Sequence, residues 1–366
     1  MSQVPIGRDK FELDTPVLCI DLEAMDSNIS KMAEYIHSRG KQWRPHQKCH
    51  KTPAIAHKQL AAGAIGVTCG KVSDAEVMAA GGVFDILVAN MIAGEQKWER
   101  VAALCRHARP IIACDHFAQV EPLAAICRKR GVECPMLIEV NIGLDRVGIR
   151  PGADTLALAE AIDKLEGVRL AGIMGYEGHL LQVPEADGKQ SQIADAMGIL
   201  AETRRQIEAK GISCEIVSAG GTGSYQITSD CEGITELQAG GGIFACPMYQ
   251  QKCELTGLDY SLSVLATVVS RPQKDRAVLD AGRKSHHPDF AMPLVKGYPD
   301  AKVVRVSAEH CEVELTGESQ NLKIGDKIEL IPGYADFTTV MHEAFYGFRG
   351  NVLETVWPIL GRGRLQ

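Results

Sequence analysis

Residues 44–51 bring together side chains that are suited to amine and proton-transfer chemistry. The segment reads Arg-Pro-His-Gln-Lys-Cys-His-Lys and contains His46, Lys48 and His50. A lysine that is partly removed from water has a lowered pKa and can act as an amine nucleophile. Because side chains alternate along a strand, an extended segment would place His46 and Lys48 on one face. A basic turn at the surface is the alternative interpretation, and the spacing alone does not decide between the two.

Two glycine-rich segments are suited to binding an anion. Residues 218–224 read Ser-Ala-Gly-Gly-Thr-Gly-Ser, and residues 238–242 read Gln-Ala-Gly-Gly-Gly. Glycine lets backbone N–H groups approach an anion, and the hydroxyl groups of Ser218 and Thr222 can add donors. Neither segment has the lysine of a P-loop or the strand–turn–helix context of a dinucleotide-binding loop. Tight turns without a ligand are the alternative.

Two further segments follow apolar runs and carry a cation and an aromatic ring. Arg146 lies in a polar loop after residues 134–141, and its guanidinium group can bind a phenolate or a carboxylate. The alternative for Arg146 is a surface ion pair with Asp145. Tyr176 follows the apolar residues 169–175 and could stack on a ligand, donate a hydrogen bond or transfer a proton. A tyrosine packed at the rim of the fold is the alternative there.

The elements that must position these residues are apolar strands that alternate with amphipathic helices. Such alternation is typical of a parallel sheet covered by helices, and eight units indicate a closed (β/α)8 TIM barrel. The candidate residues then lie at the C-terminal ends of the strands, where barrel enzymes have their active sites. An open, doubly wound sheet is the alternative. The expected strands span residues 42–48, 65–69, 85–90, 109–115, 134–141, 169–176, 214–220 and 236–244.

The pattern changes after about residue 255, where apolar and polar residues alternate in segments that are separated by turns. This alternation predicts a mainly antiparallel β-domain. The strand expected at residues 16–22 could join it. We therefore expect a barrel at residues 23–252 and a β-domain formed by residues 1–22 and 253–366.

The composition is typical of a globular protein and limits the classes of partner. The chain has 366 residues, of which 45% are hydrophobic and 23% charged, and its net charge is −7. This charge does not favour a nucleic-acid partner, and no apolar segment is long enough for a membrane helix. The first residues lack the apolar core of a signal peptide. The 12 cysteines show no CxxC spacing, which indicates reduced thiols in a cytoplasmic protein.

Segments spread over nearly the whole chain resemble the family of D-threonine aldolase and D-serine dehydratase. This family shares the alanine racemase type of fold, called fold type III among enzymes that use pyridoxal 5'-phosphate (PLP). The segments, in chain order, are FELDTPVLCIDLEAMDSNI, RPHQKCHK, CGKVSDAE, VNIGLDRVGI, GYEGH, SAGGTGS, TELQAG, VLDAGRKS and LETVWPI.

The resemblance implies a PLP-bearing barrel in which Lys48, and not Lys51, forms the Schiff base with the cofactor. It implies that Arg146 lies near the phenolic oxygen of PLP, that Tyr176 lines the ring, and that Gln238 lies near the pyridine nitrogen. The remaining residues that we expect to bind the cofactor, through its phosphate or nearby, are His46, Ser218, Thr222, Gly223, Gly240, Gly241 and Tyr249.

The sequence departs from the family pattern at positions that matter for chemistry. Gly70 replaces a glutamine, residues 240–242 are three glycines instead of Gly-Ser-Tyr, and Glu177 replaces His or Gln. The family holds a divalent metal with His-x-Asp or His-x-Cys, and the matching residues here are Tyr334 and Asp336. A phenol with a pKa of about 10 is a poor metal ligand, so we expect no metal unless His342, His179 or Glu177 joins Asp336.

These features lead to an expected reaction, the aldol cleavage of a β-hydroxy-D-amino acid to glycine and an aldehyde. His50, His179 or Tyr334 would act as the base without a metal. A racemase or epimerase, a dehydratase that eliminates the β-hydroxyl group, and a PLP-binding protein without turnover are the alternatives. The resemblance also implies a homodimer, and the expected partner is a small amino acid.

Overall fold

The structure is a computed structural model that describes residues 6–366. It consists of two compact units. The barrel unit is formed by Met32–Gly240 and Gly363–Gln366, and the β unit is formed by the described chain up to Lys31 and by Gly241–Arg362. The domain boundaries predicted from the sequence, after residues 22 and 252, stay a prediction.

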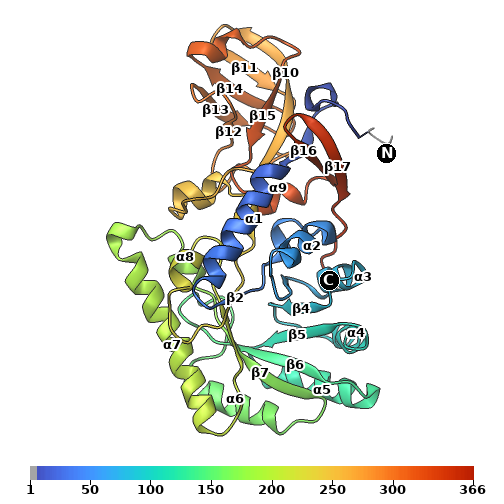
Figure 1. Cartoon of the computed structure of the whole chain (residues 1–366), viewed down its shortest axis with the longest axis vertical. Helices are drawn as coiled ribbons and strands as arrows, with labels where there is room; N and C mark the ends of the chain where they lie inside the picture. Colours follow the sequence, from blue (N-terminus) through green and yellow to red (C-terminus); the bar gives the residue numbers. More distant parts are fainter. Residues whose placement is uncertain (1–5) are drawn as a thin grey trace. The chain divides into compact units, whose positions relative to one another are not determined.

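Eight parallel strands form the barrel unit, in the order β2-β9-β8-β7-β6-β5-β4-β3 (Figure 1). The two end strands are joined by a parallel bridge between His46 and Thr68, and by hydrogen bonds from Ile65 N to Trp43 O and from Thr68 N to Pro45 O. The sheet therefore closes, which confirms the predicted TIM-type barrel. The strands are β2 (Gln42–Trp43), β3 (Val67–Cys69), β4 (Asp85–Val88), β5 (Arg109–Cys114), β6 (Cys134–Glu139), β7 (Val168–Met174), β8 (Ile216–Ala219) and β9 (Glu236–Leu237).

Helices connect these strands, as the amphipathic segments predict. The expected helix at residues 94–108 is α4, and the long one near residues 186–210 is α7. The last connection had little helical pattern and contains only the four-residue helix α8. Helix α1 (Leu22–His37) precedes the first barrel strand, and the helices between strands are α2 (Pro53–Ala61), α3 (Val72–Ala80), α4 (Glu95–Leu104), α5 (Phe117–Arg130), α6 (Ala153–Asp163), α7 (Lys189–Ala209) and α8 (Tyr225–Thr228).

A buried ion network joins the strands at one end of the barrel. Arg44 Nε lies 3.1 Å from both carboxylate oxygens of Glu236, and its guanidinium also bonds Asp85. Arg44 and Glu236 are buried, whereas the side chain of Asp85 is 28% exposed. Because Arg44 follows β2, Glu236 begins β9 and Asp85 begins β4, one guanidinium group connects three strands.

The first predicted strand is too long. It was expected to reach Lys48, but β2 ends at Trp43, and Gln47–Cys49 form a short 3-10 helix, η2. The chain turns because His46 Nδ1 accepts a hydrogen bond from Lys48 N at 3.2 Å, which caps the helix. His46 and Lys48 are therefore not alternating residues of one strand, and the sequence argument that places them on one strand face is wrong.

The β unit is a nine-stranded sheet in the order β11-β14-β13-β12-β15-β10-β1-β16-β17, and β11 also pairs with β10. All pairs are antiparallel except β1 with β16. This confirms both the antiparallel β-domain and the participation of the N-terminal strand. The elements are β1 (Val17–Asp21), β10 (Leu262–Gln273), β11 (Arg276–Leu279), β12 (Leu294–Val295), β13 (Ala301–Val306), β14 (Cys311–Leu315), β15 (Lys327–Ile331), α9 (Ala335–Thr339), β16 (Ala344–Arg349) and β17 (Val352–Pro358).

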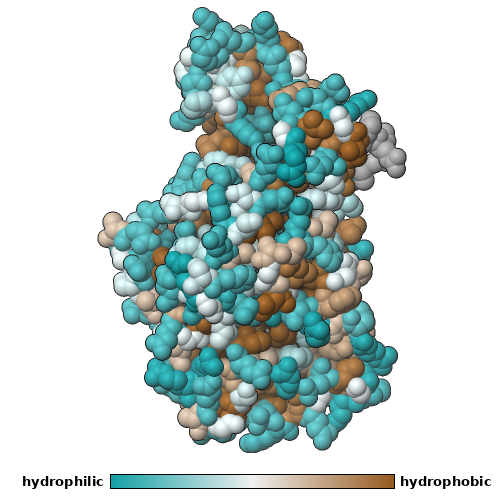
Figure 2. All heavy atoms as spheres, in the orientation of Figure 1, coloured by the Kyte–Doolittle hydropathy of each residue, from teal (hydrophilic) through white to brown (hydrophobic). Residues whose placement is uncertain are grey.

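Each unit has a core of its own. Leu87, Leu137 and Met174 are packed together in the barrel unit, and Cys19, Leu265 and Phe348 are packed together in the β unit. All twelve cysteines are free thiols. Hydrophilic residues cover most of the face that Figure 2 shows, with smaller groups of hydrophobic residues between them. Within residues 6–366, no helix combines the length and the apolar character that a membrane crossing needs.

Candidate active site

Lys48 lies in η2, just beyond the C-terminal end of the first barrel strand, and its side chain is exposed. The sequence predicts an amine that is partly removed from water, and the exposure of the Lys48 side chain does not agree with that prediction. The difference arises because Lys48 lies in a turn beyond the strand and not within the packed sheet. The amine is therefore accessible to a small molecule at the barrel mouth.

Lys51, the other lysine of the segment, is held in a buried ion pair. Its Nζ lies 2.7 and 2.8 Å from the two carboxylate oxygens of Asp74 in α3. The side chains of Lys51 and Asp74 are 12% and 4% exposed. A lysine amine that bonds both oxygens of a buried carboxylate in this way is occupied, so the geometry favours Lys48 as the reactive amine.

His46 lies between Lys48 and the second glycine-rich segment. Its backbone N–H donates to Gln238 O at 3.0 Å. A β-carbon on Gly240 would lie 2.1 Å from His46 O, so only glycine fits at position 240. Burial, together with the cationic side chains of Lys48 and Arg146, holds the pKa of His46 well below its usual value. Gly240 therefore has a packing reason to be glycine, independent of the predicted contact with a phosphate.

His50 is completely buried, and its ring makes structural hydrogen bonds. Its Nδ1 accepts from Thr52 N at 3.0 Å, and its Nε2 lies 3.4 Å from Gln59 Oε1. Burial lowers the pKa of His50 to about 3. With Nδ1 already accepting a backbone hydrogen bond and the ring shut off from solvent, this geometry argues against the predicted role of His50 as a catalytic base.

We expect the stability of the protein to depend on pH through His50. The folded protein keeps this ring neutral down to about pH 3, whereas the unfolded chain protonates it near 6.5. The unfolded state therefore binds more protons between these values, and stability falls as the pH drops below 6.5, by about 1.4 kcal/mol per pH unit for this group. Urea unfolding of the wild type and of His50→Gln should show a stability difference that shrinks on acidification. A difference that is independent of pH would contradict the assignment.

Arg146 and Tyr176 lie together at the barrel mouth. The centre of the guanidinium group is 5.7 Å from the centre of the Tyr176 ring. Arg146 Nη2 also lies 3.9 Å from Glu139 Oε1, at the end of β6. Burial raises the pKa of Glu139 to about 7, although the charge of Arg146 opposes this shift. A carboxyl group with such a pKa is suited to proton transfer near neutral pH.

The first glycine-rich segment packs under Tyr176 and leaves two backbone donors unused. A β-carbon on Gly221 would lie 2.9 Å from the Tyr176 ring, so glycine is required there. Gly221 N donates to Ser224 Oγ at 3.0 Å. Within the described chain no hydrogen bond uses the N–H groups of Thr222 and Gly223, although both residues are buried. Buried N–H groups normally have a partner, so these two are available to an anion.

Ser218 and Gln238 form a polar pair between neighbouring strands. Gln238 Nε2 donates to Ser218 Oγ at 3.0 Å, and both side chains are buried. Ser218 lies near the end of β8, and Gln238 directly follows β9. This bond fixes the amide orientation of Gln238, the residue that the resemblance places near the pyridine nitrogen of PLP.

The remaining predicted residues belong to the β unit. Gly241 begins the 3-10 helix Gly241–Ile243, and Tyr249 lies in the π-helix Met248–Lys252. The Tyr249 ring centre is 5.9 Å from that of Tyr334. Tyr334 O–H donates to Asp336 Oδ2 at 2.9 Å, and both residues are buried.

These residues do not fit a divalent metal ion. A phenol that donates its proton to Asp336 is not an anionic ligand, and it occupies a carboxylate oxygen that the metal would need. His342, a possible substitute ligand in the same unit, bonds Ser285 O through Nε2 at 2.7 Å. Within residues 6–366, His, Cys, Asp and Glu side chains form no group of three that could hold a metal. We therefore derive no chemical step through a metal.

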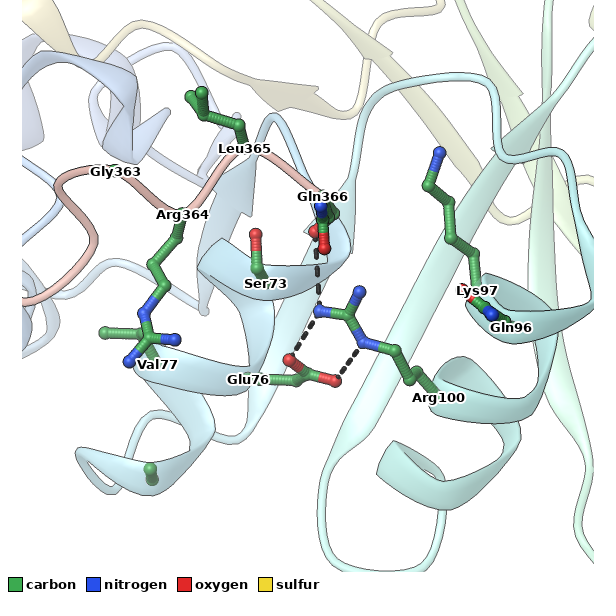
Figure 3. Close-up of a pocket in the computed structure, with 11 residues that line it drawn as sticks. Ser73, Glu76, Val77, Gln96, Lys97, Arg100, Gly363, Arg364, Leu365 and Gln366 are labelled. Carbon is green, nitrogen blue, oxygen red and sulfur yellow. Dashed lines mark hydrogen bonds and ion pairs between the residues drawn. The ribbon is translucent and has the colours of Figure 1, made fainter.

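A cavity of about 920 Å³ lies between α3, α4 and the last four residues, and no residue of a barrel strand lines it. Figure 3 shows Arg100 among the residues that line it, and its guanidinium group bonds both oxygens of Glu76 at 2.8 and 2.7 Å. Ser73 N also donates to Gln366 O at 2.8 Å. None of the predicted site residues lines this cavity, so we place the candidate site at the barrel mouth.

Asp74 and Glu139, two carboxylates near the site, were not predicted from the sequence as functional candidates, and Glu177 was predicted only in another role. Asp74 holds Lys51, Glu139 faces Arg146, and Glu177 bonds the first glycine-rich segment. The available signal was a lone carboxylate after an apolar strand, as in the run that ends at Glu139. From the sequence, Glu177 was a departure from the family pattern and a possible metal ligand, and its bonds to the first glycine-rich segment were not foreseen.

Comparison with known sequences shows the family of the chain. The pattern of the alanine racemase N-terminal domain matches residues 20–246, and that of a putative serine dehydratase domain matches residues 261–348. The chain belongs to the alanine racemase N-terminal domain family. The resemblance stated from the sequence is therefore confirmed.

Relatives in this family cover nearly the whole chain. A 3-hydroxy-D-aspartate aldolase from Paracoccus denitrificans (strain Pd 1222) is 33% identical over 367 residues, which covers 98% of this chain and 94% of the relative. A D-threonine aldolase from Arthrobacter sp. is 33% identical over 360 residues, with coverage of 98% and 95%.

Solved structures in the family have the same fold. A D-threonine aldolase from Filomicrobium marinum superposes with a TM-score of 0.96 at 33% identity and covers 100% of both chains. A D-threo-3-hydroxyaspartate dehydratase from Delftia sp. HT23 superposes with a TM-score of 0.85 at 26% identity, covering 96% of this chain and 98% of that one.

Proposed function

We propose that the protein is a PLP-dependent lyase that cleaves a β-hydroxy-D-amino acid to glycine and an aldehyde. The observation that carries this proposal is the combination of an accessible amine on Lys48 with the unused N–H groups of Thr222 and Gly223 at the strand ends. An amine and an anion-binding loop at one end of the barrel suit an aldehyde cofactor with a phosphate group. The aldolases among the relatives support the same reaction class.

In this proposal, different residues of the barrel unit bind different parts of the cofactor. Bound PLP supplies an electron sink for bond cleavage at the substrate's α-carbon. Lys48 would hold it covalently, and Thr222 and Gly223 would bind its phosphate through backbone N–H groups. Arg146 would present its guanidinium group to an oxygen of the ring, and Tyr176 would pack beside it.

Proton transfer has a candidate in the barrel unit that the sequence did not suggest. Glu139 is buried, has a pKa of about 7 and faces Arg146. It can hold or release a proton near neutral pH, whereas the geometry of His50 argues against that role. The assignment of Tyr334 as a catalytic residue stays a prediction.

A direct test supplies D-threonine, D-phenylserine and 3-hydroxy-D-aspartate to the PLP-saturated protein. We expect glycine and the corresponding aldehyde from at least one of them, and no reaction with the L-isomers. Absence of glycine with all three D-substrates would contradict the proposal.

The Tyr334–Asp336 hydrogen bond leads us to propose that the reaction does not require a metal. We expect the purified protein to hold less than one divalent ion per chain, and chelation with EDTA to leave the rate unchanged. Elemental analysis and rate measurements test this. Tyr334→His, which places an imidazole two residues before Asp336, is the matched variant and should bind Mn²⁺ more tightly than the wild type. One tightly held ion per wild-type chain, with loss of rate on chelation, would refute the proposal.

A dehydratase reaction is the second candidate. A D-threo-3-hydroxyaspartate dehydratase from Delftia sp. (strain HT23) is 31% identical over 274 residues, which covers 74% of this chain and 72% of the relative. Release of ammonia and a keto acid, instead of glycine and an aldehyde, would identify it. A homodimer and a cytoplasmic location stay predictions, and sedimentation analysis tests the former.

A further inference from the structure

Glu177 is a buried carboxylate whose side chain, within the described chain, accepts hydrogen bonds from residues 220–228, which belong to the loop of the first glycine-rich segment and to the helix α8 that follows it. It directly follows Tyr176 after the end of β7, and its side chain has no exposure to solvent. Its Oε1 accepts from Ser224 Oγ and from Thr228 Oγ1, each at 2.6 Å. Its Oε2 accepts from Gly220 N at 3.3 Å. Burying a carboxylate is costly unless such donors compensate for the lost water, so these bonds fix the loop strongly around Glu177.

The loop's backbone donors can be accounted for one by one. Gly220 N–H is used by Glu177, and Gly221 N–H is used by Ser224 Oγ at 3.0 Å. Ser224 N–H donates to Gly221 O at 3.1 Å. The N–H groups of Thr222 and Gly223, between these anchors, are therefore the pair left for a ligand. The anchors on both sides are organised by one carboxylate, through Gly220 directly and through Ser224.

The conformation of this loop does not follow from its own sequence alone. Gly220 has a φ of +80°, and a β-carbon there would lie 2.4 Å from a methyl group of Leu237. Glycine loses more conformational freedom on ordering than any other residue, so a loop with three glycines needs external anchors. A loop that is already ordered binds its ligand more tightly, because the ordering cost is not taken from the binding energy.

We propose that Glu177 is a positioning residue that holds residues 220–224 in the shape that presents the Thr222 and Gly223 N–H groups to a phosphate monoester. This inference rests on the proposed function, in which the phosphate belongs to PLP. Loss of the anchor then weakens binding of the phosphate group and leaves binding of the aldehyde and ring unchanged. PLP and pyridoxal, which lacks the phosphate, separate these two contributions.

The test compares Ser224 with Ser229, two buried serines that are five positions apart in the chain. Ser224 donates to Glu177, whereas Ser229 donates to Tyr225 O and makes no bond to Glu177. Dissociation constants of PLP and pyridoxal are measured by titrating the full chain after removal of its cofactor. We expect Ser224→Ala to weaken PLP about tenfold, the scale of one lost buried hydrogen bond to a charged group, with little change for pyridoxal. Ser229→Ala should change neither constant.

Two variants of Glu177 separate hydrogen-bond acceptance from packing. Glu177→Ala should lower the preference for PLP over pyridoxal at least as much as Ser224→Ala. Glu177→Gln should keep most of the preference, because its amide oxygen can accept from Gly220 N while the hydroxyl groups of Ser224 and Thr228 reverse their roles. Thermal unfolding of each variant checks that it is folded.

The possible results are distinct. A wild type that does not bind PLP, or that binds PLP and pyridoxal equally, would overturn the proposed function and this inference together. A wild type that prefers PLP, with Ser224→Ala and Glu177→Ala keeping its full preference, would overturn only the role of Glu177. An equal loss in Ser224→Ala and Ser229→Ala would also overturn it, because the effect would then not depend on the Glu177 contact.

Discussion

Lys48→Ala is expected to abolish turnover, whereas Lys51→Ala is expected to keep it. Removal of a nucleophile that forms a covalent bond costs on the order of 10³-fold or more in rate. Lys48 is exposed, so its loss should leave the free energy of unfolding nearly unchanged. Lys51→Ala should instead lower stability, because Lys51 bonds the buried Asp74 and its removal leaves that carboxylate without a partner. Such a loss costs about 3 kcal/mol or more of stability.

The two substitutions are thus expected to have opposite effects: Lys48→Ala lowers the rate and Lys51→Ala lowers the stability. Steady-state rates with a D-amino acid report on the amine, and urea unfolding reports on the ion pair. Both variants carry the same substitution, three residues apart, so each serves as the control for the other. Activity that depends on Lys51 and not on Lys48 would contradict the assignment of the reactive amine.

The largest effect on stability is expected at Arg44. Arg44→Met should lower the free energy of unfolding by about 3–5 kcal/mol, because it leaves the carboxylate of Glu236 buried without its partner. Arg109 is a matched control, since its Nε lies 3.6 Å from the same Asp85 but its side chain is 76% exposed. Arg109→Met should cost at most about 0.5–1 kcal/mol.

A double variant sharpens this prediction. Arg44→Met combined with Glu236→Gln removes both buried charges and should be less destabilised than Arg44→Met alone. Urea denaturation of the four proteins gives the required energies. Equal losses for Arg44→Met and Arg109→Met would show that the buried network does not hold the ends of β2, β4 and β9 together.

The barrel could be predicted because its signals are local in the sequence. Strands such as β5 and β6 are continuous apolar runs, and helices such as α4 and α7 repeat with helical spacing. The end of a strand is less predictable. Residues 44–48 contain nothing that forbids an extended chain, yet the His46 side chain caps η2 and turns the backbone. That contact depends on how the ring lies after folding.

The chemistry of individual site residues was harder to predict than their positions. His50 lies beside Lys48 in sequence and looked like a base, but burial and the bond from Thr52 N give its ring a structural environment. Glu177 shows the opposite case, since its contacts with Gly220 and Thr228 join residues 43 and 51 positions away in the chain. Such long-range hydrogen bonds leave no periodic pattern in the sequence.

The arrangement of the β unit was predictable only in part. Alternating polarity indicated antiparallel strands after residue 255, and β1 was expected to join them. The parallel pairing of Cys19 with Tyr346, within β1 and β16, could not be foreseen. Polarity can alternate in the same way along a strand whether its neighbour is parallel or antiparallel, so the direction of pairing is set by the rest of the sheet.

The central claim is that the Lys48 amine binds an aldehyde cofactor, and mass spectrometry tests it most directly. The wild-type protein is saturated with PLP, reduced with borohydride, digested and mapped by peptide. The account predicts one phosphopyridoxyl group per chain, on the peptide that contains Lys48 and on that side chain. A label on Lys51, or a reduced protein that carries no label, would contradict it.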